Sequence, residues 1–468
     1  MSDKRPNTGM VHLGLGAFYR AFGCVYVADA MASSGGDWGI LGVSLRNATI
    51  RDALRSQEWL YTSVSMGEAG EQWRIIDVLN NVLVAPENPA AVLDAMANAA
   101  VKIVSLTVTE KGYCHNPATG ELNLDHVDIQ HDLTHSLPQS APGFLVRALQ
   151  MRRTAGLAPF TVLTCDNLPK NGELVRGVVL QLAKQIDSEL HDWIAEEGRF
   201  PSTMVDRITP ATTDEDIARV ASLTGRKDAA PVVHEPFSQW VVEDNFVQGV
   251  RPDLAAAGAQ LVDEVEAYEH MKLRMLNGTH SALAYTGYLA GHETIADTIA
   301  DPVFHDYAKQ LWTEIMPAVD APPDVDITDY ADALLERYRN PRIRHRTWQI
   351  AMDGSQKLPQ RILDTVYENL QAGRPSPCLC LAVVAWMRYV GGIDESGQAI
   401  DVRDPLAGLL QEVASAATTP TETVTSLLAV VDVFPADKVE LLSGPLSLAA
   451  AQLWRLGARR AVQELCHG

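Results

Sequence analysis

The chain has 468 residues, a net charge of −21 and a hydrophobic content of 47%, values typical of a soluble globular protein with two domains. The excess of 59 acidic over 38 basic residues argues against a nucleic-acid or anionic-membrane surface, because both need clustered positive charge. An acidic chain can still contain a local basic pocket that binds a small anion. No apolar run reaches the roughly 18 to 20 residues needed to cross a bilayer, and the short run 10–15 does not have the form of a signal peptide.

The first half of the chain alternates strand-like with helix-like runs. Strands are expected at residues 10–14, 38–45, 61–65, 73–84, 101–107 and 160–164, with helical runs between most of them. The runs 61–65 and 73–84 are predicted as added strands that form a hairpin. Alternating strands and helices predict parallel β-α-β units, whose ligands bind at the carboxyl ends of the strands.

After about residue 262, long helical periodicities dominate. They cover residues 268–289, 302–316, 329–338, 356–371, 380–389, 405–416 and 437–464. The pattern predicts an α/β protein with two domains. Residues 1–262 are expected to form a Rossmann-like, doubly wound sheet that binds a dinucleotide, and residues 263–468 a mainly α-helical domain that binds substrate and carries the catalytic residues.

A glycine turn follows the first predicted strand. Gly14-Leu15-Gly16 stands where the backbone must turn tightly and approach a pyrophosphate at the start of a helix. The third glycine of the usual motif is absent, because Tyr19 occupies its position. No acidic residue for the ribose follows the second strand, and Arg46 there would suit a 2′-phosphate. The choice between NAD and NADP therefore stays open.

The stretch from Glu269 to His280 places three chemically active side chains on one predicted helix. At about 100° per residue, Lys272, His280 and Asn277 fall at about 0°, 80° and 140° around its axis. Burial lowers the pKa of an amine, so such a lysine could exchange a proton near neutral pH while a carboxamide holds an oxyanion. A solvated polar stripe is the competing interpretation.

Other polar and sulfur-containing residues point less clearly to a site. Asp166-Asn167 follows a strand's carboxyl end, which favours a site over a plain turn. His126, His131 and His135 have a spacing like that of metal ligands, but a solvated helix is favoured because no further ligand motif accompanies them. The six cysteines are dispersed without a C-x-x-C pair, which predicts reduced thiols and the cytoplasm.

Six motifs in order make the chain resemble the polyol-specific long-chain dehydrogenase family. They lie at residues 11–20, 105–113, 165–169, 200–210 and 235–240 and in the K-x4-N-x2-H helix at 272–280. The run from Arg344 to Arg361 resembles most closely the fructuronate reductase branch, which acts on D-mannonate. Mannitol dehydrogenases carry an arginine at the position of Gln349.

The resemblance implies metal-free, NAD-dependent hydride transfer with Lys272 as the general acid–base. Asn167 and Asn277 would form an oxyanion hole, His280 would bind and orient the substrate, and Glu269 would act as a proton relay. Lys357 would contact substrate hydroxyls, in a substrate site that also includes Asn167, Lys272, His280 and Arg346. The residues expected to bind the coenzyme are Gly14, Gly16, Ala17, Phe18, Arg20, Arg46, Thr109 and Glu110.

We therefore expect reversible oxidation of D-mannonate to D-fructuronate, with mannitol or arabinitol 2-dehydrogenase as the closest enzymatic alternative and an NAD-binding sensor as a non-catalytic one. An anionic substrate needs a cation at its carboxylate, and Arg344, Arg346 and Arg361 are the candidates. The sequence leaves the oligomeric state open, as a monomer or a small homo-oligomer, and predicts neither a nucleic-acid nor a membrane partner.

Overall fold

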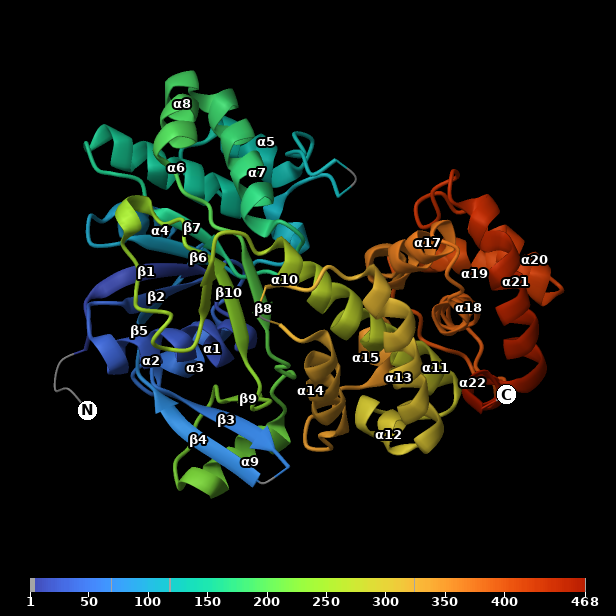
Figure 1. Cartoon of the computed structure of the whole chain (residues 1–468). Coiled ribbons are helices and arrows are strands. Elements are labelled where there is room, and N and C mark those ends of the chain that lie inside the picture. Colours follow the sequence, from blue (N-terminus) through green and yellow to red (C-terminus); the bar gives the residue numbers. More distant parts are fainter. Residues whose placement is uncertain (1–4, 69, 118, 324, 468) are drawn as a thin grey trace. The chain divides into compact units, whose positions relative to one another are not determined.

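The computed structural model describes residues 5–68, 70–117, 119–323 and 325–467. Contacts within the chain divide it into two compact units, Met1–Glu266 and Ala267–Gly468 (Figure 1). Among the described helices, none combines the length and the apolar composition that crossing a bilayer requires.

A five-stranded parallel sheet forms the centre of the first unit, with the order β5-β2-β1-β6-β7. Its strands are β1 (Thr8–Leu13), β2 (Gly39–Ser44), β5 (Leu79–Val84), β6 (Ile103–Leu106) and β7 (Thr161–Thr164). Val11 of β1 pairs with Leu41 of β2 on one side and with Val104 of β6 on the other. The strand order therefore reverses beside β1, which is where an open α/β sheet binds its ligand.

Apolar side chains cover both faces of this sheet, which explains why its strands are nearly continuous hydrophobic runs. Val11 and Leu13 pack into one core and Met10 into the other. The first core contains α4 (Pro89–Ala97), α5 (Val127–Thr134), α6 (Ala141–Thr154), α7 (Asn171–Ile186) and α8 (Ser188–Glu197); the second contains α1 (Ala17–Ala21), α2 (Gly23–Ser34) and α3 (Thr49–Arg55). The Rossmann-like doubly wound sheet expected from the sequence is confirmed.

Two three-stranded sheets accompany the central one. They comprise β4 (Gly70–Ile76), β3 (Tyr61–Gly67) and β9 (Val232–His234), and β11 (Gln260–Val262), β10 (Gln239–Glu243) and β8 (Thr203–Asp206); α9 (Asp214–Thr224) lies between β8 and β9 in sequence. The single strand predicted at 73–84 is wrong, because β4 and β5 occupy it in different sheets. The exposed Asp77 separates them, and only β4 belongs to the hairpin with β3.

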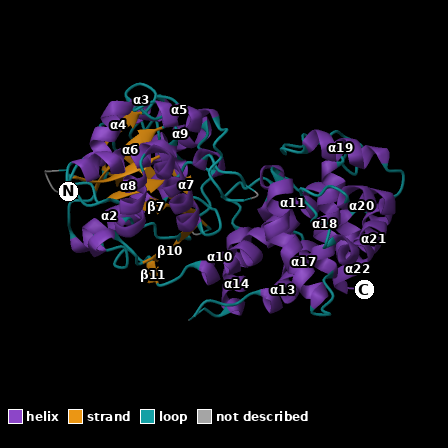
Figure 2. Ribbon diagram, turned by 90° about the horizontal axis from the view of Figure 1, so that it is seen from above, coloured by secondary structure: helices purple, strands orange, loops and turns teal. Residues whose placement is uncertain are grey.

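The second unit is helical in its described residues (Figure 2). Its α-helices are α11 (Thr279–Leu289), α12 (Ile295–Ala300), α13 (Pro302–Ile315), α14 (Ile327–Arg339), α15 (Thr347–Ala351), α16 (Gly354–Leu358), α17 (Asp364–Gln371), α18 (Pro377–Val390), α19 (Ala407–Ala416), α20 (Pro420–Leu428), α21 (Val439–Leu456) and α22 (Ala458–His467), and α10 (Glu266–Met271) leads into it. The apolar helix α18 is buried along most of its length and is part of the core of this unit. The mainly helical C-terminal half is thus confirmed.

Three of the predicted long helices are interrupted. The helix expected at 268–289 contains a π-helical turn at Lys272–Gly278, and the one at 356–371 contains a second at Pro359–Leu363. The helix expected at 437–464 breaks at Gly457, whose φ of 78° is favourable only for glycine. A π turn keeps the helical direction but changes the number of residues per turn, so an apolar pattern of roughly helical period does not reveal it.

Candidate functional site

Side chains of neighbouring helices form hydrogen bonds and an ion pair with the π-helical turn Lys272–Gly278. Its wider hydrogen-bonding ring leaves carbonyl oxygens available to other donors. Tyr338 of α14 donates its hydroxyl to the Leu276 carbonyl at 2.9 Å, and Trp312 of α13 donates its indole N–H to the Met275 carbonyl at 3.4 Å. The Arg274 guanidinium pairs with Glu368 of α17. The turn is therefore supported by contacts from three helices.

This turn changes where the predicted catalytic side chains lie. The angle of about 140° between Lys272 and Asn277 assumed a uniform α-helix, and that assumption is wrong here because these residues lie in a π turn. A ring closed between residues five apart places Asn277 roughly one turn above Lys272, on the same side of the helix. Lys272, Asn277 and His280 are 6%, 7% and 5% exposed, which rules out a solvated stripe. Glu269 lies on α10, half-buried, three residues before Lys272.

A second helical segment brings cations to the same region. An ideal Cβ on Gly278 would lie 2.6 Å from the carbonyl oxygen of Arg361, so the two π turns are in direct backbone contact. The Arg361 guanidinium lies 3.2 Å from the Ser281 hydroxyl. One helical turn earlier, the ammonium of Lys357 donates to the Met352 carbonyl at 2.6 Å.

His280 faces two aromatic rings. Its ring centroid lies 4.6 Å from that of His345 and 5.0 Å from that of Tyr338. Burial holds the pKa of His280 well below its usual value, and the charges of His345, Arg361 and Arg337 lower it further. Burial, with Lys357 and Arg361, lowers the pKa of His345 to about 4. Both imidazoles are therefore neutral near pH 7 and can each accept one hydrogen bond and donate another.

The other two predicted arginines flank His345 in the sequence. Arg344 and Arg346 are exposed and pair with the same carboxylate, Glu293, at 3.1 and 3.6 Å. Gln349 is exposed on α15. Arg346, the arginine expected at the substrate, thus has an acidic partner on the surface, whereas Arg361 contacts the residue next to His280.

The predicted glycine turn lies at the carboxyl end of β1 in the first unit. Gly14 and Leu15 donate their amides to the Val43 carbonyl of β2 at 2.9 and 3.2 Å. Gly14 has a φ of 90°, and a Cβ there would lie 2.2 Å from the Thr107 carbonyl oxygen. Gly16 is exposed, and a Cβ there would meet nothing closer than 3.8 Å. We call the backbone of this turn, residues 14–16, the cradle. A side chain has no room at Gly14, whereas the space beside Gly16 is open.

A buried polar network supports this cradle. His12 lies 2.9 Å from the Ser105 hydroxyl and 2.8 Å from the Thr107 hydroxyl, and Thr107 donates to the Gly14 carbonyl at 2.8 Å. Tyr19, which stands in place of the third glycine, stacks its ring on His12 and lies 3.0 Å from Ser105. Burial lowers the pKa of His12 to about 3, so the ring stays neutral.

Asp166 joins the loops that follow β6 and β7. Its carboxylate accepts the amides of Val108 and Thr109, both at 2.9 Å, and the Tyr113 hydroxyl at 2.7 Å. The neighbouring Asn167 is exposed. Gly14, Thr109 and Asn167 therefore all follow the carboxyl ends of parallel strands, at one edge of the central sheet.

The remaining residues expected at the coenzyme have different surroundings. Arg46 is exposed after β2, and Ala17, Phe18 and Glu110 are half-buried. The Arg20 guanidinium is buried and donates to the Ala230 carbonyl. We therefore assign Arg20 a role in packing the first unit.

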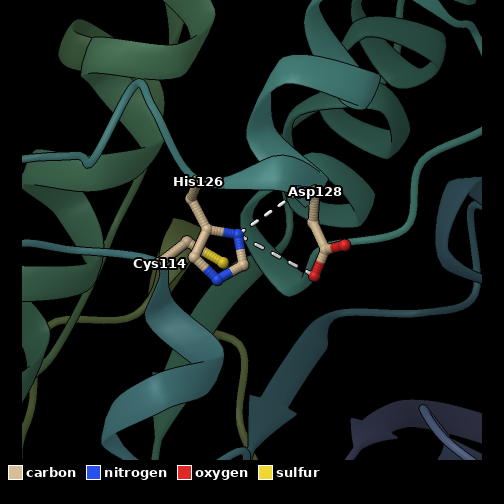
Figure 3. A group of neighbouring side chains, drawn as sticks. All are labelled: Cys114, His126 and Asp128. Atoms are coloured by element: carbon tan, nitrogen blue, oxygen red, sulfur yellow. Dashed lines mark hydrogen bonds and ion pairs between the residues drawn. The ribbon is translucent and has the colours of Figure 1, made fainter.

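Cys114, His126 and Asp128 form a further group in the first unit (Figure 3). One ligand-type atom from each lies within 4.8 Å of the others. His126 is the N-cap of α5 rather than part of a helix with His131, and its Nδ1 accepts the Asp128 amide at 3.3 Å. Burial raises the pKa of Cys114 to about 12, with Asp128 adding to the shift. The contact of Nδ1 with the Asp128 amide gives His126 a capping role at the start of α5.

Several residues that shape both sites escaped the sequence analysis. Tyr338, Ser281, His345 and His12 lie far along the chain from the motif residues that they contact. The cluster of basic residues at 342–346 indicates that the segment of His345 could bind an anion, but no local pattern marks Ser281 or Tyr338.

Comparisons with known proteins agree with this architecture. The model of the mannitol dehydrogenase Rossmann domain matches residues 8–256, and that of the mannitol dehydrogenase C-terminal domain matches residues 264–442. The D-mannonate oxidoreductase of Escherichia coli is 45% identical over 470 residues, which cover 98% of this chain and 96% of that protein. A mannitol 2-dehydrogenase of Phaeosphaeria nodorum is 44% identical over 86% of this chain and 72% of its own length.

Solved structures give the same result. The ternary complex of Pseudomonas fluorescens mannitol 2-dehydrogenase with NAD and D-mannitol superposes with a TM-score of 0.88 at 36% identity, over 99% of this chain and 95% of that one. A substrate-free D-sorbitol dehydrogenase gives a TM-score of 0.89 at 31% identity, over 98% and 95% of the two chains.

Proposed function

The chain belongs to the mannitol dehydrogenase family of oxidoreductases, and we propose that it interconverts D-mannonate and D-fructuronate with NAD as the hydride carrier. The D-mannonate oxidoreductase of E. coli is similar over nearly the full length of both chains. All six cysteines are unpaired, which supports a reducing compartment such as the cytoplasm.

One observation carries the catalytic part of the proposal. Beside the buried Lys272, the Nδ2 atom of Asn277 and the Nε2 atom of His280 are buried without a hydrogen-bond partner among the described residues. Buried polar atoms normally have partners, and leaving one without costs about 1–3 kcal/mol. A substrate hydroxyl bound beside Lys272 would supply the partners that both atoms lack.

The proposed chemistry follows from these groups. In the oxidation direction Lys272 takes the hydroxyl proton, and Glu269, one turn earlier, passes it towards solvent. The developing alkoxide accepts hydrogen bonds from the carboxamide of Asn277 and, by the resemblance, from that of Asn167. Neutral His280 orients the substrate through a hydroxyl, and Lys357 contacts a further hydroxyl. In the reverse direction the Lys272 ammonium returns the proton to the carbonyl oxygen.

The first unit offers groups that fit a dinucleotide. The cradle at Gly14 and Gly16 has no side chain to block a pyrophosphate, and Thr109, Glu110, Ala17 and Phe18 lie in the segments around the same sheet edge. NAD, when bound, supplies the nicotinamide ring that accepts hydride from the carbinol carbon. Arg46 is exposed and follows β2. In that place its guanidinium would contact the ribose of NAD or the 2′-phosphate of NADP.

Two other functions make different predictions. Mannitol 2-dehydrogenases are nearly as similar to this chain as the mannonate enzyme, so mannitol or arabinitol is the alternative substrate. A sensor that binds NAD without turnover is the non-catalytic alternative. It would leave the buried lysine and its two unpartnered neighbours without a role.

A substrate panel separates these possibilities. Initial rates of reduced-nicotinamide formation should be measured with D-mannonate, D-altronate, D-mannitol and D-arabinitol, each with NAD and with NADP. We expect the highest kcat/KM for D-mannonate with NAD. A higher value for mannitol would replace the substrate assignment, and absence of turnover on all four substrates, with NADH still bound, would leave the sensor.

A further inference from the structure

Arg361 differs from Arg274, Arg344 and Arg346 in having no acidic partner among the described residues. Arg274 pairs with Glu368, and Arg344 and Arg346 pair with Glu293. For Arg361, no carboxylate among the described residues lies within ion-pair distance, and its Nε is buried without a hydrogen-bond partner. A partly buried guanidinium without a counter-ion is costly, and the chain has 59 acidic residues from which a partner could have been recruited.

The surroundings of Arg361 add positive rather than negative charge. Lys357 lies four residues earlier, and the Lys357 ammonium is 3.9 Å from the half-exposed Asp353 carboxylate. Burial lowers the pKa of Arg361 to about 10, and burial together with the Arg361 charge lowers the pKa of Lys357 to about 8. Arg361 also lowers the pKa of His280 and of His345. Asp353 and Asp404 offset part of this positive potential at Lys357, but neither carboxylate forms an ion pair with Arg361 among the described residues.

The position of Arg361 ties this potential to the proposed catalytic side chains. Gly278 packs against the Arg361 carbonyl, and the guanidinium reaches Ser281, the residue after His280. Both contacts lie on the helix that carries Lys272 and Asn277. Contacts between two packed helical segments, and not a loop, thus hold the Arg361 guanidinium near the helix that carries Lys272.

We propose that Arg361 binds the carboxylate of the substrate and so selects sugar acids over neutral polyols. This inference rests on the proposed function, since it assigns the end group of the molecule that Lys272 deprotonates. A guanidinium matches a carboxylate in shape and hydrogen-bonding geometry. A neutral polyol has no charge to offer it.

The test compares two arginines on two substrates. Arg361→Gln should lower kcat/KM for D-mannonate by at least about thirtyfold, mainly through KM, because one partner of a buried charge pair is removed. It should change kcat/KM for D-mannitol by less than about threefold. Arg455→Gln in α21 is the matched control, because its guanidinium is exposed and already paired with Glu464, and it should change neither value by more than about threefold.

Binding gives a second readout. With NADH present, D-mannonate should raise the unfolding temperature of the wild type and of Arg455→Gln but not of Arg361→Gln. Should Arg361→Gln not fold, Arg361→Lys keeps the charge and should retain a preference for mannonate over mannitol.

Equal losses on both substrates in Arg361→Gln, or a selective loss of mannonate activity in Arg455→Gln, would overturn the inference. Neither result would affect the proposed function. The proposed function is contradicted only if the wild-type enzyme does not oxidise D-mannonate in preference to the polyols.

Discussion

Gly14 and Gly16 lie two residues apart in the turn after β1, yet an added methyl group should have different effects at the two positions. Gly14→Ala places Cβ against the Thr107 carbonyl oxygen at a φ of 90°, which we expect to destabilise the protein by about 1–2 kcal/mol or more. Gly16→Ala fits the fold, so its unfolding temperature should stay near that of the wild type. Its methyl group would occupy the space proposed for a pyrophosphate, so its affinity for NADH should fall at least about tenfold.

Thermal unfolding and NADH titration by fluorescence measure the two effects separately. A Gly16→Ala variant with unchanged NADH affinity would contradict the assignment of this turn to the coenzyme.

At the residue scale, burial could be predicted where one motif contains the side chains, but contacts with distant segments of the chain could not. The spacing of Lys272, Asn277 and His280 in the sequence was enough to propose a reactive helix face, and all three are buried. The sequence could not distinguish Arg361 from Arg344 and Arg346, because their difference depends on Glu293, 51 residues before Arg344. Nor could it reveal that Tyr19 stacks on His12 in place of a close glycine contact.

At the scale of elements, the contact between the two π turns is the feature most open to test. Gly278→Ala would push its Cβ into the Arg361 carbonyl oxygen, a backbone atom that cannot rotate away. We expect a loss of about 1–3 kcal/mol in stability and a higher KM for D-mannonate, because the segment carrying Arg361 and Lys357 must shift.

Gly408→Ala in α19 is the matched control for this change. It lies in a helix of the same unit with nothing within 4 Å of the added Cβ, so it should leave KM unchanged and raise stability by up to about 1 kcal/mol. Urea unfolding measures the stability of both variants, and steady-state kinetics measures their KM for D-mannonate. A Gly278→Ala variant with stability and KM like those of Gly408→Ala would show that the packing described for the two turns is wrong.

Elements were predictable in type and order but not in their interruptions. Parallel strands and long helices have strong apolar periods, and those at β1, β2, β6, β7, α13 and α18 were all expected. The division of 73–84 between two sheets was not, because Asp77 interrupts the run without showing which sheet each part joins. The π turn at Lys272–Gly278 was missed because tertiary contacts from Tyr338 and Trp312 support it.

At the scale of the whole molecule, buried histidines should make the protein sensitive to mild acid. Burial lowers the pKa of His12 to about 3, and that of His234 and His345 to about 4. The unfolded chain binds these protons near pH 6.5, so between about pH 6.5 and 4 unfolding takes up protons and stability falls as the pH falls. The stabilising effect of the neutral rings is fully present above pH 6.5.

His234→Gln isolates one contribution. His234 lies 2.9 Å from the Ser63 hydroxyl and 2.7 Å from the Glu235 carbonyl oxygen, contacts that a carboxamide can in part replace. Between pH 6 and 4.5 its free energy of unfolding should fall less steeply than that of the wild type, by up to about 1.4 kcal/mol per pH unit. Parallel pH profiles from urea unfolding would show that His234 protonates equally in both states.

The proposed reaction depends on the amine of Lys272 as the proton donor and acceptor, and the Lys272→Met variant tests this role most directly. Methionine keeps the length and apolar stem of the side chain but cannot carry a proton. We predict that kcat for D-mannonate oxidation falls about 10²–10⁴-fold while the affinity for NADH stays within about threefold of the wild type. Retention of more than a tenth of the wild-type kcat would contradict the assignment of Lys272 as the general acid–base.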